Sequence, residues 1–171
     1  MGGTAEWGIL RVCEKYCVQS NKWSELPGLK MIRCSPGSVL LSPMVAFCFC
    51  GRQYFKRNLN TIESIRIETD SEWKILALND HVPNTNQIGV AQFEGKLMMF
   101  GGDEYWRVTS QFSLEGELIV DHSGDKGIPG QMNSHSFTVG QDGKIYAVEQ
   151  EEGSKNPGEW RVKVFDGKKW N

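Results

Sequence analysis

The stretch that decides the fold is EGKLMMFGG at 94–102, a glycine turn followed by an apolar run that closes on two glycines. The pattern recurs as DGKIYAVEQ at 142–150 and, with one glycine lost, as VAFCFCG at 45–51. A glycine turn before such a short apolar run predicts a tight turn that leads into a buried strand. The runs are too short for core helices, so they predict a repeated β unit.

Tryptophans show the length of the repeat. Trp23 and Trp73 lie about 50 residues apart, and Trp170 follows after about twice that interval. In the copy between them, ELIV at 117–120 replaces the tryptophan segment. Each copy is therefore a unit of about 50 residues, and one copy has lost its tryptophan.

Four short strands are predicted in each complete copy. The first strands are expected at 32–41, 86–92 and 134–139, and each precedes an apolar run. Polar strands follow at 13–18, 64–69 and 162–166, and tryptophan strands at 23–26, 73–76 and 170–171. In SIRIET (64–69), Ile65 and Ile67 share one face, which is typical of a half-buried strand. Such antiparallel units must stack on one another to bury both faces.

These residues resemble the Kelch repeat, an apolar strand that ends in a glycine pair and is followed by a tyrosine and a tryptophan. The matching positions are Gly2, Gly3, Tyr16, Trp23, Gly51, Trp73, Gly101, Gly102 and Trp170. The resemblance implies an all-β fold, a β-propeller of four-stranded antiparallel blades around a central channel. It also implies that Tyr and Trp fill the space between adjacent blades.

The resemblance covers the whole chain, so residues 1–171 are expected to form one Kelch domain of about three and a half blades. The expected blades are 1–26 (half), 32–78, 86–120 and 134–171. The first copy starts at the end of a second strand, which predicts a loop at 4–7. Closed rings have about four to eight blades. We therefore expect a partial propeller, with its other blades supplied by the same longer chain or by another subunit.

Composition favours a soluble interaction domain. The net charge of -2 gives no field that would attract nucleic acid or an anionic membrane. No apolar run is long enough to cross a bilayer, and no secretory signal is visible. The expected location is cytoplasmic, including association with the cytoskeleton.

The five cysteines are odd in number and form no secreted-type framework. They are expected to be buried free thiols in a reducing compartment, with Cys48 and Cys50 on one face of one strand. The alternative is a zinc site or a redox sensor, but a matching second cysteine pair is lacking. We expect no metal and no cofactor.

The candidate binding residues follow the glycine positions, in loops that a propeller would place on one face. They are Trp7, Tyr54, Phe55, Arg57, Tyr105, Trp106 and Arg107. Aromatic and arginine side chains are enriched at binding hot spots. The alternative is that these aromatics pack against the loop of a neighbouring blade.

The sequence contains no phosphate-binding glycine motif and no nucleophile elbow, and its three histidines are scattered. We therefore expect a non-enzymatic module that binds other proteins, as a scaffold, cytoskeletal or substrate-recognition propeller. One alternative is a substrate receptor of a cullin-type ubiquitin ligase, although the BTB domain usual in such receptors is not in these residues. The alternative from another class is a propeller enzyme, an oxidase or epimerase, with its site in absent blades.

Overall fold

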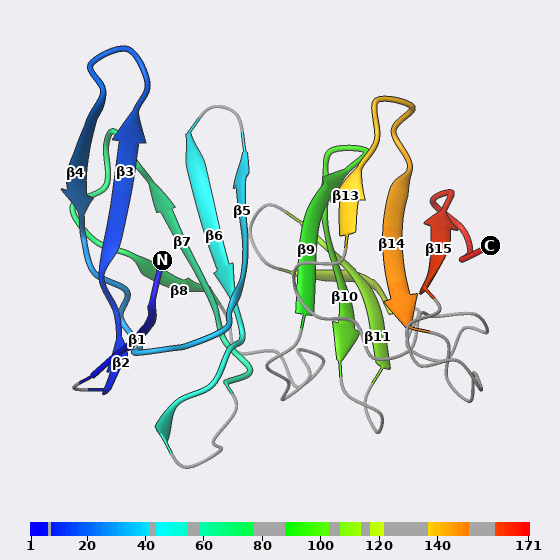
Figure 1. The fold of residues 1–171 in the computed structure, drawn as a ribbon, viewed down its shortest axis with the longest axis horizontal. Coiled ribbons are helices and arrows are strands. Elements are labelled where there is room, and N and C mark those ends of the chain that lie inside the picture. Colours follow the sequence, from blue (N-terminus) through cyan, green and yellow to red (C-terminus); the bar gives the residue numbers. More distant parts are fainter. Residues whose placement is uncertain are drawn as a thin grey trace.

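The computed structural model describes residues 1–6, 8–41, 44–54, 59–76, 88–102, 107–113, 117–121, 137–150 and 160–171. Within these ranges every named element is a β-strand, and every strand pair is antiparallel (Figure 1). No helix in this part of the chain could span a membrane. The all-β class predicted from the sequence is confirmed.

Two four-stranded sheets form the middle of the molecule, and each follows the chain order as a meander. The first contains β5 (Gly37–Leu41), β6 (Val45–Phe49), β7 (Ile62–Arg66) and β8 (Lys74–Leu76). The second contains β9 (Ile88–Phe93), β10 (Lys96–Gly102), β11 (Arg107–Phe112) and β12 (Leu118–Asp121). The predicted four-stranded antiparallel unit is confirmed for these two copies.

Smaller sheets flank the middle pair. At the carboxyl end is a three-stranded sheet of β13 (Phe137–Val139), β14 (Ile145–Gln150) and β15 (Trp160–Phe165). An isolated bridge between Phe165 and Trp170 occupies the place predicted for its tryptophan strand. At the amino end are two ribbons, β1 (Gly3–Ala5) with β2 (Gly8–Leu10), and β3 (Cys13–Cys17) with β4 (Lys22–Leu26).

The amino end differs from the expectation in one respect. Residues 4–7 were predicted to be a loop, yet Thr4 and Ala5 belong to β1 and pair with Ile9 and Gly8. This prediction is wrong because the chain turns back on itself at once and forms a hairpin. Only β3 and β4 keep the expected order of polar strand and tryptophan strand.

The turn quoted first is confirmed in detail. Phe93 and Lys96 are paired, and the two residues between them, Glu94 and Gly95, have φ angles of 47° and 74°. Two successive positive φ angles are typical of a type I′ turn, whose twist matches that of the strands it joins. The turn therefore fixes the register of β9 against β10.

The apolar strands contribute to two cores at once, because successive side chains of a strand point to opposite faces. In β10, Leu97 and Met99 pack toward the β5–β8 sheet, whereas Met98 and Phe100 pack toward the β13–β15 sheet. All four side chains are fully buried. A near-continuous apolar run is what a strand between two cores requires.

Strand β6 repeats this arrangement one sheet earlier. Phe47 and Phe49 face the β9–β12 sheet. Ala46 and Cys48 face the opposite way, into a third core that also contains Cys13 of the β3–β4 ribbon. The β3–β4, β5–β8, β9–β12 and β13–β15 sheets therefore follow one another, with an apolar core between each neighbouring pair (Figure 1).

The first strands of neighbouring sheets approach closely, β5 to β9 and β9 to β13. Glycine permits this approach: a Cβ on Gly37 would lie 2.7 Å from Cγ2 of Val90. A Cβ on Gly89 would collide with the ring of Phe137. Both glycines thus occupy places where no side chain fits.

Candidate functional site

Of the loop residues predicted to bind a partner, Tyr54 has the best-defined place. Its side chain is about half exposed, at 48%. A Cβ on Gly8 would come within 2.5 Å of the Tyr54 hydroxyl oxygen, so the phenol ring lies against strand β2. The connection that follows β6 therefore adjoins the β1–β2 hairpin, and Tyr54 both contacts this neighbour and faces solvent.

Arg107 was predicted to lie in a loop, but this placement is wrong: it is the first residue of β11, where its backbone pairs with Gly102 at the end of β10. The other predicted binding residues lie outside the described residues; they are Trp7, Phe55, Arg57, Tyr105 and Trp106.

Gly51, Gly101 and Gly102 lie at or just after the end of an apolar strand, whereas Gly3 begins β1 and Gly2 precedes it. Gly3 donates its backbone N–H to the carbonyl oxygen of Arg33, at 2.9 Å, and Gly2 donates to Val12 at the same distance. Gly51 directly follows the β6 segment, and its carbonyl accepts the N–H of Leu59 at 2.8 Å. Gly101 and Gly102 are the last residues of β10.

The tryptophans of the repeat have different environments. Trp73 is completely buried, and its indole Nε1–H donates to the carbonyl oxygen of Pro27 at 2.7 Å. Trp170 is also buried, and its ring centroid lies 5.8 Å from that of Phe100. These two pack between sheets as expected.

Tyr16 and Trp23 do not pack between sheets. They face each other across the β3–β4 ribbon, with ring centroids 5.2 Å apart, and their exposed fractions are 43% and 67%. For this copy the expectation of burial is wrong, because no described sheet covers the outer side of the ribbon.

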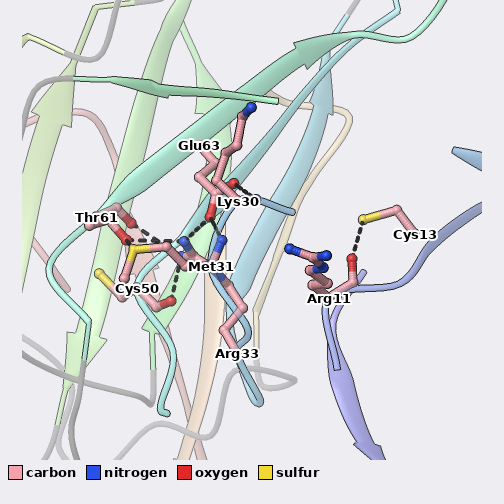
Figure 2. A network of polar contacts seen from close by, with 8 residues as sticks. All are labelled: Arg11, Cys13, Lys30, Met31, Arg33, Cys50, Thr61 and Glu63. Atoms are coloured by element: carbon pink, nitrogen blue, oxygen red, sulfur yellow. Dashed lines mark hydrogen bonds and ion pairs between the residues drawn. The ribbon is translucent and has the colours of Figure 1, made fainter. Parts of the chain in front are cut away.

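A buried ion pair joins the connection between β4 and β5 to the sheet behind it (Figure 2). Arg33 and Glu63 have no exposed side-chain surface and share a charge-assisted hydrogen bond from Nη2 to Oε1. Arg33 also donates from Nη1 to the carbonyl oxygen of Cys50, at 2.7 Å, and from Nη2 to Oγ1 of Thr61, at 3.0 Å. The guanidinium thereby joins three segments of the chain.

Glu63 completes the network from β7. Its Oε2 accepts the backbone N–H of Lys30 at 2.6 Å, and its Oε1 accepts that of Met31 at 3.1 Å. A buried carboxylate needs such partners, because an unpaired buried charge costs several kcal/mol. Only Nε of Arg33 lacks a partner among the buried side-chain atoms of the described residues. Apart from Nε of Arg33, the polar groups of the pair have partners within the protein, and the network holds the 27–36 connection against β7.

The cysteines Cys13, Cys34, Cys48 and Cys50 are buried free thiols, as expected, whereas Cys17 is exposed. Burial raises the pKa of Cys48 and that of Cys50 to about 12, which keeps both thiols protonated. The placement of Cys48 and Cys50 on one face is wrong: they lie in different cores. Cys50 has a φ of 52°, which ends the strand's alternation and turns its side chain to the other side.

Cys17 has the opposite electrostatics. Hydrogen bonding to Ser20, first from its side chain and then from its backbone, lowers the pKa of this thiol below the ordinary value of 9.0. It occupies the end of β3 opposite Lys22. The surroundings of Cys17 therefore favour its thiolate, in contrast to those of Cys13, Cys48 and Cys50.

The described residues contain no group of three His, Cys, Asp or Glu side chains placed to hold a metal ion. No family model matches the chain, and no curated protein matches its sequence. The assignment of a function therefore depends on the surface itself.

One surface feature was missed by sequence reasoning. The outer side of the β3–β4 ribbon carries two exposed carboxylates, Glu14 and Glu25, next to the exposed pair Tyr16 and Trp23. The period of two in CEKYC at 13–17 contained the signal, because it separates Glu14 and Tyr16 from the buried Cys13.

Proposed function

We propose that the chain is a Kelch-type propeller unit that acts as a non-catalytic protein–protein interaction module. Three features of the fold support the architecture: repeated antiparallel meanders, sheets that pack on both faces, and first strands that approach closely through Gly37 and Gly89. First strands that converge from sheet to sheet suit a ring of blades around an axis.

The observation that carries the binding role is the place of Tyr54. A tyrosine that is fixed against the β1–β2 hairpin and still 48% exposed offers a partner a rigid amphipathic side chain. Tyr54 itself follows the buried strand β6 by only five residues. We infer that the predicted loop residues continue this surface with further aromatic and basic groups.

The test compares two variants with wild type. One replaces Tyr54 by Ala, and the other replaces Tyr105, Trp106 and Arg107 by Ala together. Leu40→Ala is the matched control, since Leu40 is 57% exposed but lies within β5 rather than in a loop. Each immobilised protein is incubated with cell extract, and bound proteins are crosslinked to it. Each captured protein is then quantified by mass spectrometry.

We expect the same partner to be captured by wild type and by the control, and to be lost from both loop variants. Circular dichroism must show the wild-type β signal in all of them. Equal capture by the loop variants would reject the loop surface. Loss of the β signal in the triple variant alone would show that those side chains pack within the fold, which contradicts the proposal.

A further inference from the structure

The outer side of the β3–β4 ribbon presents four side chains as two cross-strand pairs. Glu14 lies directly opposite Glu25, and Tyr16 lies directly opposite Trp23. Glu14 and Tyr16 are two residues apart on β3, so both pairs share one face. The reverse face contains Cys13 and Leu26, which pack into the interior. The four residues therefore form one patch that points away from the core.

The aromatic half of the patch is fixed in place. The Tyr16 hydroxyl donates a hydrogen bond to Oδ1 of Asn21, in the turn that joins the two strands. The Tyr16 and Trp23 rings are tilted by 46° at a centroid distance of 5.2 Å, and both remain accessible. Exposed rings held in position are suited to receive a cation on their faces.

Within the part of the chain that the structure describes, the acidic half of the patch has no partner of opposite charge. Like charges directly opposite each other on an antiparallel pair are destabilising. Among the described residues, neither Glu14 nor Glu25 has an ion pair with a lysine or an arginine. A positive group placed between the two carboxylates would relieve their repulsion. The charge of the patch thus specifies a cationic ligand.

We propose that this patch, Glu14, Tyr16, Trp23 and Glu25, binds an arginine-bearing extended segment of a partner protein. A guanidinium is planar, stacks on aromatic faces and donates two parallel hydrogen bonds to a carboxylate. The aromatic rings and the carboxylates that a guanidinium requires are both present on the outer face of the ribbon. An ammonium group would use the charge but not the planar contact, so lysine is expected to bind more weakly.

The ribbon can also accept the backbone of such a segment. Within the described residues, β3 and β4 pair only with each other, so each strand keeps one unpaired edge. An extended peptide that adds to an edge forms backbone hydrogen bonds and presents alternate side chains to one face. Its alternate arginines would then reach the patch in register with the strand period.

The experiment titrates the chain with an acetylated, amidated tetra-arginine peptide by calorimetry, and follows the indole N–H of Trp23 by nuclear magnetic resonance. Glu14→Gln with Glu25→Gln keeps the shape of the patch and removes its charge. Glu94→Gln with Glu117→Gln removes the same net charge from two exposed sites elsewhere and is the matched control. Trp23→Ala removes the ring.

We expect wild type and the control to bind equally and the Trp23 indole signal to shift. Removal of the two patch carboxylates should weaken binding about tenfold, equivalent to about 1.4 kcal/mol. Trp23→Ala should also weaken binding of the tetra-arginine peptide. Tetra-lysine should bind less tightly than tetra-arginine. Added salt should reduce the affinity of every variant for either peptide. Equal affinities for wild type and the Glu14/Glu25 variant would overturn the proposal, and so would an equal loss in the control.

A second copy of the chain is the competing occupant. Self-association through this face would give a species of twice 19.3 kDa that Trp23→Ala converts to monomer and that the peptide does not displace. That result would overturn the proposal. The Tyr105, Trp106 and Arg107 triple variant should bind tetra-arginine like wild type. Failure of the loop surface can therefore be distinguished from failure of this patch.

Discussion

Arg33 and Glu63 form an ion pair in which neither side chain has any surface exposed to water. The residues are 30 positions apart in sequence and belong to different parts of the fold, a connection and strand β7. Glu63 in addition accepts the backbone N–H groups of Lys30 and Met31. One carboxylate therefore holds the course of the chain between two sheets.

Glu63→Ala should destabilise the protein by about 3–5 kcal/mol, because it leaves the Arg33 charge buried without its partner. Unfolding in urea measures the loss. Glu68→Ala, an exposed carboxylate shortly after β7, is the control and should change stability by less than about 0.5 kcal/mol. Replacing Arg33 and Glu63 together by Met should cost less than Glu63→Ala alone. A double variant as unstable as the single one would contradict this account.

Trp73 and Trp23 are matching positions in the predicted repeat but should respond differently to truncation. Trp73→Ala removes a fully buried ring and its hydrogen bond to Pro27, so it should cost about 3–5 kcal/mol. Trp23→Ala removes a ring that is 67% exposed and should cost less than about 1 kcal/mol. The midpoints of urea unfolding of the two variants, compared with that of wild type, measure these losses of stability. Similar losses would show that the ribbon's outer side is covered.

Gly89→Ala should destabilise the chain, because the new methyl group would collide with the ring of Phe137. A double-mutant cycle tests the cause. Phe137→Ala alone removes a ring contact with Phe100, whose centroid lies 4.5 Å away. In that background Gly89→Ala should cost less than in wild type, with a coupling of about 1 kcal/mol or more. Additive losses of stability would show that the cost of Gly89→Ala does not come from the ring of Phe137.

Cys17 should be the first thiol to react in the native protein. Its pKa is lowered, chiefly by hydrogen bonding to Ser20, whereas burial raises the pKa of Cys13, Cys48 and Cys50. Iodoacetamide labelling followed by peptide mass spectrometry should modify Cys17 rapidly, and faster as the pH rises through the pKa of its thiol. Cys17→Ser should abolish this fast phase. Rapid native labelling of Cys48 would contradict the assignment.

Acid should destabilise the carboxyl end through Asp166. Its carboxylate accepts the backbone N–H groups of Lys169 and Lys168, which lower its folded-state pKa below the ordinary 3.8. The stabilisation is therefore complete above about pH 4 and is lost as the pH falls through the folded-state pKa. Melting temperatures of wild type and Asp166→Asn should differ at pH 6 and converge near pH 2. A constant difference over this range would exclude the mechanism.

The sequence predicted those features whose signals are local. The turn at Glu94–Gly95 and the strand after it were predictable, because a glycine turn and an uninterrupted apolar run lie side by side in the chain. The four strands between 37 and 76 followed from the same pattern.

The rest depends on contacts between distant residues. The local signals of Trp23 and Trp73 are alike, and what differs is whether another sheet covers them. The spacing of residues in the sequence does not indicate that Arg33 pairs with Glu63. Strand alternation would put Cys50 on the same face as Cys48, but the positive φ of Cys50 turns its side chain to the other face. Of the candidate binding residues, the sequence indicated the loop position of Tyr54 but not its contact with Gly8.

Strand β10 divides LMMF between two cores, and β6 does the same one sheet earlier. This division sets the unit in which such a chain can change during evolution. Duplication or loss of a complete sheet leaves each neighbouring face opposite another apolar face of the same kind. Insertion or loss of a single residue within such a strand exchanges the side chains that reach the two cores. Growth by whole copies is thus the path that keeps every core intact.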